Sequence, residues 1–213
     1  MIDLITSRNA HMHRDLISQM FRLRHRVFKE QLGWDVHSIN GEERDQFDRS
    51  DTAYLIASDA SGRVDGAWRL LPTTRPYLAS TAFPQLFDGC TPPHSSAVWE
   101  CSRFVVDPSK REVTSAGIDV TTASLLVAII EFAVTYNVEE IVSVESPAVA
   151  RLHDRARERK PRWRGSIHRF GEMKALVSRY DIDGAMLTSL RRKYNAPAPI
   201  ISQLALWDQL AAA

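Results

Sequence analysis

The chain has 213 residues, of which 44% are hydrophobic and 25% are charged. This length fits one α/β domain, residues 1–213, and this apolar fraction is sufficient for a sizeable core. The formal net charge of +1 argues against a general nucleic-acid binder, which would carry a basic excess.

The cysteine content and the apolar runs indicate a cytoplasmic protein. Cys90 and Cys101 are too few for a disulfide framework and are interpreted as reduced thiols. The first 15 residues lack the basic start and the unbroken apolar stretch of a signal peptide. The longest apolar run, residues 125–130, is far shorter than the roughly 20 residues that span a bilayer. We therefore expect neither a membrane nor a nucleic-acid partner, and we expect a monomer.

The first half of the chain predicts one helix followed by strands. Apolar residues recur at three- and four-residue steps over residues 11–32, as on one face of a helix. Residues 33–51 are polar with little periodicity and are predicted to form a loop. Two strands follow at 53–58 and 64–71, joined by a turn at 59–63. A proline-punctuated loop then leads to a strand at 98–106.

The second half alternates between helices and strands. A helix at 117–136 is apolar on most faces and is predicted to be buried. The remaining elements are predicted as a strand at 140–145, a helix at 147–160, late strands at 167–170 and 175–178, and a helix at 183–193. This order predicts an α/β fold, in which a mixed, mostly antiparallel sheet carries helices on both faces in a three-layer sandwich.

The segment FRLRHRVFKEQLGWDVHSINGEERDQFD, residues 21–48, is the most informative part of the chain. It combines two aromatic residues, Phe28 and Trp34, with Arg24 and a spaced pair of carboxylates, Asp45 and Asp48. Such a set suits a small ligand that carries both charge signs, because an aromatic face attracts a cation by roughly 0.5–2 kcal/mol. Taken singly, Phe28 is typical of a core residue and each charge of a solvated surface.

A second cluster lies in the predicted strand 98–106. The sequence WECSRF, residues 99–104, contains the carboxylate of Glu100, the hydroxyl of Ser102 and the cation of Arg103. In a regular strand Glu100 and Ser102 share one face and Arg103 lies on the other. Glu100 and Arg103 therefore converge on one ligand only if a bulge interrupts the pleat. Arg69, on the face of its strand opposite Trp68, needs an ion-pair partner if it is buried.

Together the two clusters resemble the acyl-homoserine-lactone synthases, the autoinducer-making enzymes of bacterial quorum sensing. The resemblance covers about residues 1–175 and fades beyond them. It implies a GNAT-like fold and a reaction in which the amine of S-adenosylmethionine attacks a fatty acyl thioester. The carboxylate then closes on its own γ-carbon and expels methylthioadenosine. S-adenosylmethionine is a substrate, so no cofactor is expected. The positions that match the family signature are Arg24, Phe28, Trp34, Asp45, Asp48, Arg69, Glu100, Ser102 and Arg103.

The resemblance also implies which residues bind S-adenosylmethionine. Two arrangements of the charges are compatible with it. Either Arg24 is locked in salt bridges to the two aspartates, or the aspartates meet the substrate ammonium while Arg24 or Arg103 meets its carboxylate. The residues expected to bind S-adenosylmethionine are Phe28, Trp34, Asp45, Asp48, Arg103 and Phe104.

Glu100 is the expected general base of the reaction. A free α-ammonium has a pKa of about 8, so most of it is protonated at neutral pH and cannot attack. A buried carboxylate with a raised pKa accepts that proton, directly or through water. A structural salt bridge to Arg69 or Arg103 is the alternative interpretation. The expected catalytic set is Glu100, Arg24, Asp45, Asp48, Arg69 and Arg103.

Two serines are expected to contact the acyl chain. One is Ser102. The other, Ser143, matches a family position that often carries Ser or Thr in enzymes using 3-oxo-acyl chains, although it also fits an ordinary strand serine.

A basic run, RLHDRARERKPRWR at 151–164, contains seven Lys/Arg against two acidic residues, a net charge of +5. It is interpreted either as a solvated helix face or as a dock for an acidic partner. Acyl carrier protein, the family's usual donor, is acidic, and the phosphates of acyl-CoA would also be attracted. The candidate docking residues are Arg151, Arg155, Arg159, Lys160 and Arg162.

Other ligand sites have weaker support in the sequence. The histidines and cysteines form no metal-ligand spacing. Ser115, Ala116 and Gly117 would place free N–H groups at a helix N-terminus, where a phosphate or pantetheine arm can bind.

Two other functions were weighed against the synthase. One is a GNAT-like N-acyltransferase that uses acyl-CoA and a different amine. The missing second glycine of the acetyl-CoA motif and the intact N-terminal block argue against it. The other is a catalytically silent binding protein or regulator on the same fold. The undamaged catalytic positions and the lack of a helix-turn-helix signature argue against that function.

Overall fold

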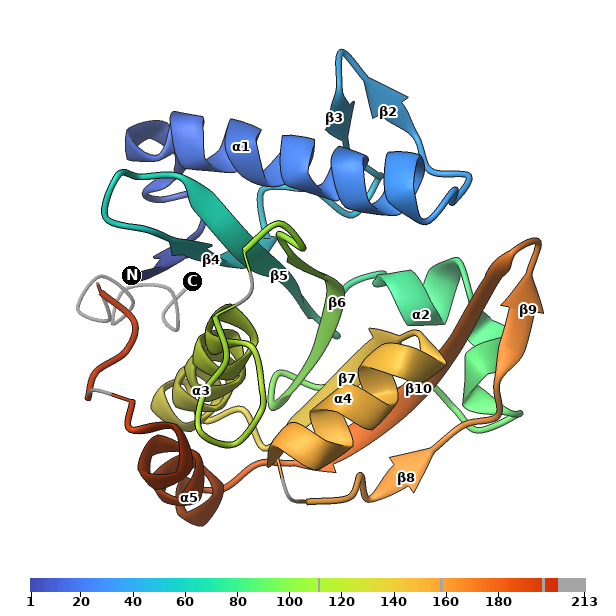
Figure 1. Ribbon diagram of the computed structural model, residues 1–213. Helices are drawn as coiled ribbons and strands as arrows, with labels where there is room; N and C mark the ends of the chain where they lie inside the picture. Colours follow the sequence, from blue (N-terminus) through green and yellow to red (C-terminus); the bar gives the residue numbers. More distant parts are fainter. Residues whose placement is uncertain (111, 158, 197, 203–213) are drawn as a thin grey trace.

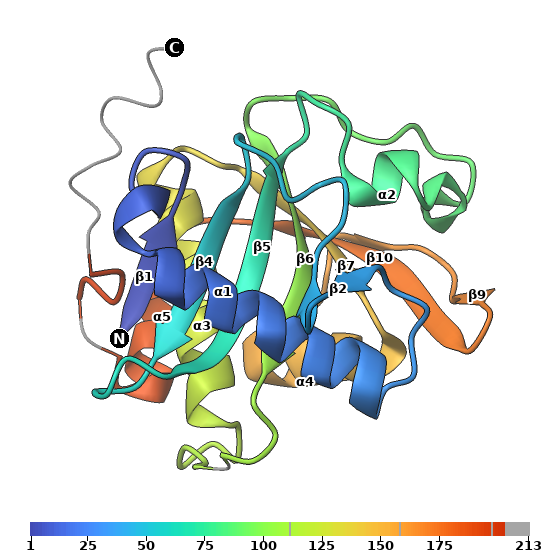
Figure 2. The ribbon, with the colours of Figure 1, turned by 90° about the horizontal axis from the view of Figure 1, so that it is seen from above.

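A central sheet forms the middle layer of the molecule (Figures 1 and 2). The computed structural model describes residues 1–110, 112–157, 159–196 and 198–202. Within them, the eight-stranded sheet has the order β1-β4-β5-β6-β7-β10-β8, with β9 paired to β10. Only β6 and β7 pair in parallel among these described strands. The strands are β1 Ile2–Ile5, β4 Ala53–Ser58, β5 Val64–Pro72, β6 Val98–Val106, β7 Glu140–Glu145, β8 Trp163–Arg164, β9 His168–Phe170 and β10 Met173–Asp181, and a separate hairpin joins β2 Ser38–Ile39 to β3 Glu42–Glu43.

Helices cover both faces of the sheet, as Figure 1 shows. Helices α1 and α2 lie on one face, and α3, α4 and α5 lie on the other. Helix α1 continues into a π-helix, η2, a rare element that often occurs at functional sites. The helices are α1 Arg14–Arg24, η2 His25–Gln31, α2 Leu78–Thr81, α3 Val120–Thr135, α4 Pro147–Arg157 and α5 Gly184–Tyr194, with 3-10 turns at Ala10–Met12 and Pro84–Phe87. The predicted three-layer α/β fold is confirmed.

Most predicted elements are confirmed, with differences at their ends. The first helix begins at Arg14 rather than residue 11, and the fourth ends at Arg157 rather than residue 160. Strand β1 and the β2–β3 hairpin were not predicted, because such short segments show no clear period. The helix predicted from residue 117 begins at Val120, after the N-cap residue Asp119.

The expected anion site at residues 115–117 is therefore not at a helix N-terminus. These residues precede the helix, and the Asp119 carboxylate accepts a hydrogen bond of 2.8 Å from the N–H of Thr122. A carboxylate at the N-cap satisfies the N–H groups that a phosphate would need.

Two irregularities of β6 position the functional residues. Strands β6 and β7 pair only from Val98 to Cys101, and beyond that point they separate. A bulge between β5 and β6 sets Arg103 and Phe104 opposite the single residue Trp68, and Arg103 has a φ of 58°. The bulge brings Arg103 onto the face that Glu100 occupies, as the expected convergence of these two residues requires.

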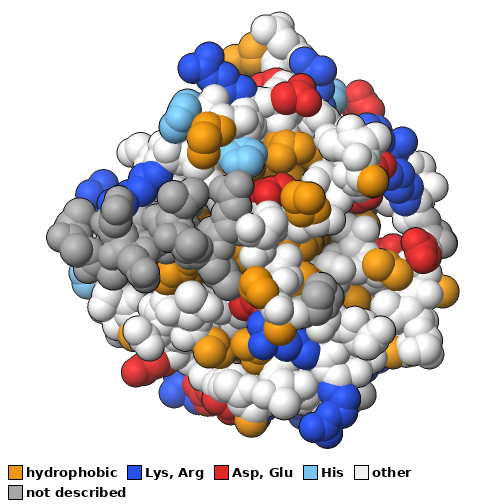
Figure 3. Space-filling model, turned by 90° about the vertical axis from the view of Figure 1, so that its left-hand side faces the viewer, with side chains coloured by type: hydrophobic (Ala, Val, Ile, Leu, Met, Phe, Trp, Pro, Cys, Tyr) orange, Lys and Arg blue, Asp and Glu red, His pale blue; other side chains and the backbone are white. Residues whose placement is uncertain are grey.

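The surface charges, the cysteines and the helix lengths can be compared with the expectations from composition. On the face that lies to the left in Figure 1, cationic and anionic side chains are interspersed (Figure 3). Cys90 is exposed, Cys101 is buried, and both are free thiols. None of the helices in the described ranges is long and apolar enough to cross a membrane.

Candidate active site

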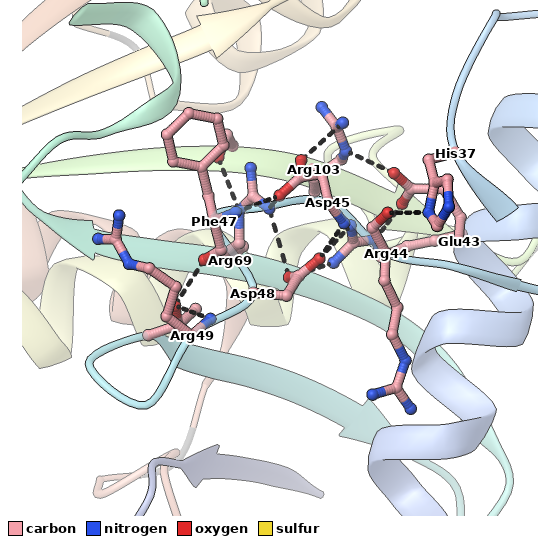
Figure 4. Close-up of polar contacts among 12 residues, drawn as sticks. His37, Glu43, Arg44, Asp45, Phe47, Asp48, Arg49, Arg69 and Arg103 are labelled. Atoms are coloured by element: carbon pink, nitrogen blue, oxygen red, sulfur yellow. Dashed lines mark hydrogen bonds and ion pairs between the residues drawn. The ribbon is translucent and has the colours of Figure 1, made fainter. Parts of the chain in front are cut away.

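Figure 4 labels Glu43, Asp45, Asp48, Arg69 and Arg103, members of a buried ion-pair network that also contains Arg24. The side chain of Arg24 is 1% exposed, and its Nε donates to Glu43 Oε2 at 2.5 Å. Its two terminal nitrogens donate to the two oxygens of Asp48 at 2.8 and 3.0 Å. Burial alone would lower the pKa of Arg24, but the two carboxylates raise it above its usual value. Of the two expected arrangements, the structure has a variant of the first: Arg24 is locked by Asp48, but its second carboxylate is Glu43. Asp45 pairs with Arg69 and Arg103 instead.

Arg69 links the strands to the same network. Its Nη1 donates to Asp45 at 2.5 Å and approaches Asp48 at 3.3 Å, and its Nε donates to Ser102 Oγ at 3.2 Å. Tyr54 donates its hydroxyl to Asp48 at 2.8 Å. Burial acts to raise the pKa of Asp48, but Arg24 and Arg69 hold that pKa far below its usual value. Asp48 is therefore a carboxylate at neutral pH.

Arg103 completes the network at its more open end. Its Nε donates to Glu43 at 3.2 Å, and its Nη2 lies 2.8 Å from Asp45 Oδ2. Burial lowers the pKa of Arg103 below its usual value. The side chains of Arg103 and Asp45 are 14% and 16% exposed, whereas those of Arg24, Glu43, Asp48 and Arg69 are 3% exposed or less. Three guanidinium groups face three carboxylates, so the network is electrically balanced.

Glu100 lies beside this network without an ion-pair partner among the described residues. It is fully buried, and its Oε2 accepts a hydrogen bond of 2.7 Å from the backbone N–H of Ala79 in α2. Its Oε1 has no hydrogen-bond partner, and neither does Nη2 of Arg69. Burial raises the pKa of Glu100, against the smaller opposing effects of the Ala79 N–H, of Arg69, of the Ser102 hydroxyl and of Arg103. Buried polar atoms without partners require an explanation, and groups reserved for a substrate provide one.

Phe28 and Trp34 form an aromatic wall next to the network. Their rings stack at a centroid distance of 5.1 Å and an interplanar angle of 7°. Both rings line a cavity of about 270 Å³ at the point where β6 and β7 separate. A wider hollow of about 750 Å³ adjoins it, and Trp34, Asp45 and Arg103 line that hollow. The N-terminal and strand clusters of the sequence therefore meet around one connected space.

The expected acyl residues take different positions. Ser102 lines the 270 Å³ cavity. Phe104, expected to bind S-adenosylmethionine, lines the same cavity and packs on Trp68 at a centroid distance of 4.9 Å. Ser143 does not line this cavity. It points toward α4, where its Oγ lies 3.3 Å from Glu145 Oε2.

The basic run does not form one continuous patch. Arg159 pairs with Asp183 at 2.7 Å, and Arg162 pairs with Glu140 at 2.5 Å. Arg151 lies near the other end of α4, at a hollow of about 610 Å³ beside Trp34. The residues that line this hollow are Leu32, Trp34, Ser146, Pro147, Ala148, Arg151, Ile167, Arg169, Glu172 and Lys174.

Two members of the network were not predicted from the sequence. The Glu43 carboxylate, 0% exposed, accepts hydrogen bonds from both Arg24 and Arg103. The Tyr54 hydroxyl donates a hydrogen bond to Asp48. Glu43 lies two residues before Asp45 in the same polar segment, and this proximity was the available signal. Within the described ranges, no three His, Cys, Asp or Glu residues are grouped to hold a metal ion.

Comparison with known proteins identifies the family. The autoinducer synthase model matches residues 8–190. An acyl-homoserine-lactone synthase of Ralstonia solanacearum is 34% identical over 182 residues, which cover 84% of this chain and 89% of that protein. The structure of a CoA-dependent acyl-homoserine lactone synthase, BjaI, with SAM and isopentyl-CoA has a TM-score of 0.83 at 28% identity, covering 95% of this chain and 92% of that one.

The fold extends further than the family. A structure described as that of an N-acetyltransferase from Lactobacillus plantarum has a TM-score of 0.56 at 12% identity, covering 85% of this chain and 99% of that one, which shows a shared fold alone. The chain belongs to the autoinducer synthase family. The resemblance seen in the sequence is thereby confirmed, as is the enzyme class, an acyltransferase that makes an acyl-homoserine-lactone signal.

Proposed function

We propose that the connected space beside Arg103 binds S-adenosylmethionine and an acyl thioester and joins them into an acyl-homoserine lactone. The observation that carries this proposal is the balanced network whose two partly exposed members, Asp45 and Arg103, line the wider hollow. In the proposed complex Arg103 meets the substrate carboxylate, Asp45 meets its ammonium, and Trp34 faces the sulfonium. Release of methylthioadenosine by the purified protein with both substrates tests the proposal.

The proposed reaction has two steps. Glu100 takes a proton from the ammonium, directly or through water, and the freed amine attacks the thioester carbonyl carbon. The carbon–sulfur bond of the thioester breaks, and the thiol leaves. One carboxylate oxygen then attacks the γ-carbon, whose bond to the sulfonium breaks and releases neutral methylthioadenosine. The acyl chain extends past Ser102 into the 270 Å³ cavity.

The Trp34→Ala variant should bind S-adenosylmethionine several-fold to about 30-fold more weakly, because it loses a cation–π contact of roughly 0.5–2 kcal/mol. Calorimetric titration with S-adenosylmethionine and, separately, with an acyl donor measures this. Donor affinity should change less. Trp163→Ala is the matched control, since Trp163 also stacks on a phenylalanine, at 6.3 Å and 15°, but lines neither cavity. Equal S-adenosylmethionine affinity in the wild type and Trp34→Ala would show that Trp34 packs on Phe28 without contacting this substrate.

We further propose that the phosphate-bearing or acidic donor docks at the 610 Å³ hollow. Arg151, Arg169 and Lys174 line it, and within the described residues none of the three forms an ion pair. Leu32 and Ile167, on the same hollow, are 51% and 58% exposed. A cation without an ion-pair partner keeps its charge available for an acidic donor. Arg159 and Arg162, in contrast, are already paired with carboxylates of this chain.

Reversing the charge of Arg151, Arg169 and Lys174 together should raise the KM for an acyl carrier protein donor by about tenfold or more at low salt. The effect should shrink as salt screens the encounter. The matched control reverses Arg155, Arg159 and Lys160, at the far end of the basic run. Steady-state kinetics with carrier-protein and CoA donors at two salt concentrations measures both variants. A larger effect in the control variant would move the dock to the far end of α4.

A further inference from the structure

A second buried polar cluster lies between α4 and the sheet, apart from the ion-pair network. The carboxylate of Glu145, at the end of β7, is 1% exposed, and its Oε2 lies 2.7 Å from Nδ1 of the fully buried His153. Ser143 Oγ is 3.3 Å from the same oxygen, and the Tyr180 hydroxyl is 3.5 Å from Oε1. Glu145 lines the 270 Å³ cavity together with Leu152, the neighbour of His153. Through Glu145 the cluster therefore reaches the wall of the proposed acyl site.

This wall offers hydrogen-bond acceptors. A carboxylate can only accept, so Nδ1 of His153 and the hydroxyl of Ser143 donate to Glu145. Burial lowers the pKa of His153, which keeps the ring neutral. Burial acts to raise the pKa of Glu145, but the hydrogen bond from His153, the nearby guanidinium of Arg157 and the Ser178 hydroxyl bring it below its usual value. The Ser143 hydroxyl donates its proton to Glu145, so Ser143 is a poor hydrogen-bond donor to the 3-oxo group of an acyl chain.

A buried carboxylate is costly in a cavity that is otherwise mostly apolar. The neighbouring lining includes Phe104, Val144, Val149 and Leu152. A plain hydrocarbon chain gains nothing from a carboxylate in this wall. An acyl group with an O–H does, because the hydrogen bond that the described residues give to Glu145 Oε1 is a long one from Tyr180, 3.5 Å, and this oxygen can accept a shorter bond.

We propose that Glu145, oriented by His153, is a specificity-determining residue that selects acyl groups carrying a hydroxyl over unsubstituted and 3-oxo chains. This inference rests on the proposed function and names the donor class of the same site. Glu145 exchanges no proton with the substrate, so the selection acts on donor binding and leaves S-adenosylmethionine binding unchanged.

The test compares kcat/KM for 3-hydroxyacyl-, 3-oxoacyl- and unsubstituted acyl-CoA of matched chain lengths, with methylthioadenosine release as the readout. The wild type should favour the hydroxyacyl donor by about tenfold or more, the value of one hydrogen bond to a charged group. Glu145→Gln keeps the size but adds an N–H donor, so its preference for hydroxyacyl over 3-oxoacyl should fall about tenfold. The KM for S-adenosylmethionine should not change.

Three further variants separate selection from packing. His153→Asn retains a donor near the Nδ1 position and should keep the preference, whereas His153→Leu should lose it. Glu131→Gln is the matched control, because Glu131 is a buried carboxylate on α3 that binds Arg191 and contacts neither cavity. Equal efficiency with all donors in the wild type, or an unchanged ratio in Glu145→Gln, overturns the inference. No methylthioadenosine from any donor overturns the proposed function instead.

Discussion

Glu100→Gln should turn over about 10²–10⁴-fold more slowly than the wild type, the usual effect of losing a general base. The amide oxygen of glutamine can still accept the Ala79 N–H, so the fold and the packing of α2 should persist. Steady-state rates and circular dichroism measure the two effects. Glu131→Gln, which also removes a buried carboxylate, should retain most of its activity. A Glu100→Gln variant with more than about half of wild-type activity would contradict the role of Glu100.

The raised pKa of Glu100 also predicts how the activity and the stability of the wild type and of Glu100→Gln depend on pH. As a base, Glu100 works only when deprotonated, so the wild-type rate should fall as the pH drops through that raised value. The unfolding free energy changes with pH in the opposite direction to the rate. A raised folded-state pKa means that the contribution of Glu100 to stability is lost as the pH rises. Glu100→Gln should therefore be at least as stable as the wild type at neutral pH, and its residual rate should lack the acid limb.

Asp48→Asn should lose about 3–5 kcal/mol of unfolding free energy at neutral pH, because it leaves the buried guanidinium groups of Arg24 and Arg69 without their shared carboxylate. Asp48 has a folded-state pKa below its ordinary 3.8. Its contribution is thus complete above that ordinary value and is lost as the pH falls through the folded-state value. The difference between wild type and variant should narrow in acid.

Denaturant unfolding at neutral pH and in acid measures this difference. The matched control is Asp181→Asn, because Asp181 is 58% exposed and pairs with the exposed Arg162. Exposed ion pairs contribute little to stability, so this variant should unfold nearly as the wild type does. A neutral-pH loss in Asp48→Asn no larger than that of the control would show that the network does not stabilise the fold.

The sequence predicted the fold where periodicity was strong. The all-round apolar helix over 117–136 and the strands at 98–106 and 140–145 are present because long apolar patterns have few alternative placements. The ends of helices depended on local capping, such as that by Asp119, which a periodicity argument does not capture. Strand β1, four residues long, is defined by its pairing with β4, and such pairing is not visible in a short segment.

The candidate site was predictable in its membership but not in its arrangement. The sequence identified Arg24, Asp45, Asp48 and Arg69 as one charged group, yet it left open which charge meets which. Burial and distance decide that question, and both depend on how α1 packs on β5 and β6 and how β3 packs on α1. The sequence showed only that a bulge is needed if Glu100 and Arg103 are to meet one ligand. It did not locate the bulge, because a positive φ at an arginine has no sequence signature.

The basic run shows why charge counting needs a structure. Seven cations against two acids in residues 151–164 predicted a positive surface, but partners distant in sequence, Asp183, Asp181 and Glu140, neutralise part of it. Arg169 and Lys174, which form no ion pair among the described residues, lie outside that run, on β9 and β10. Sequence proximity therefore located only part of the candidate dock.

Mass spectrometry of the purified protein incubated with S-adenosylmethionine and a panel of acyl-CoA and acyl carrier protein donors tests the central claim most directly. The proposed function predicts an acyl-homoserine lactone and methylthioadenosine in equal amounts, both depending on the donor. An acylated amine formed without methylthioadenosine would contradict it and would indicate an N-acyltransferase that stops after the first step. Unchanged S-adenosylmethionine with every donor would contradict any catalytic role for the site.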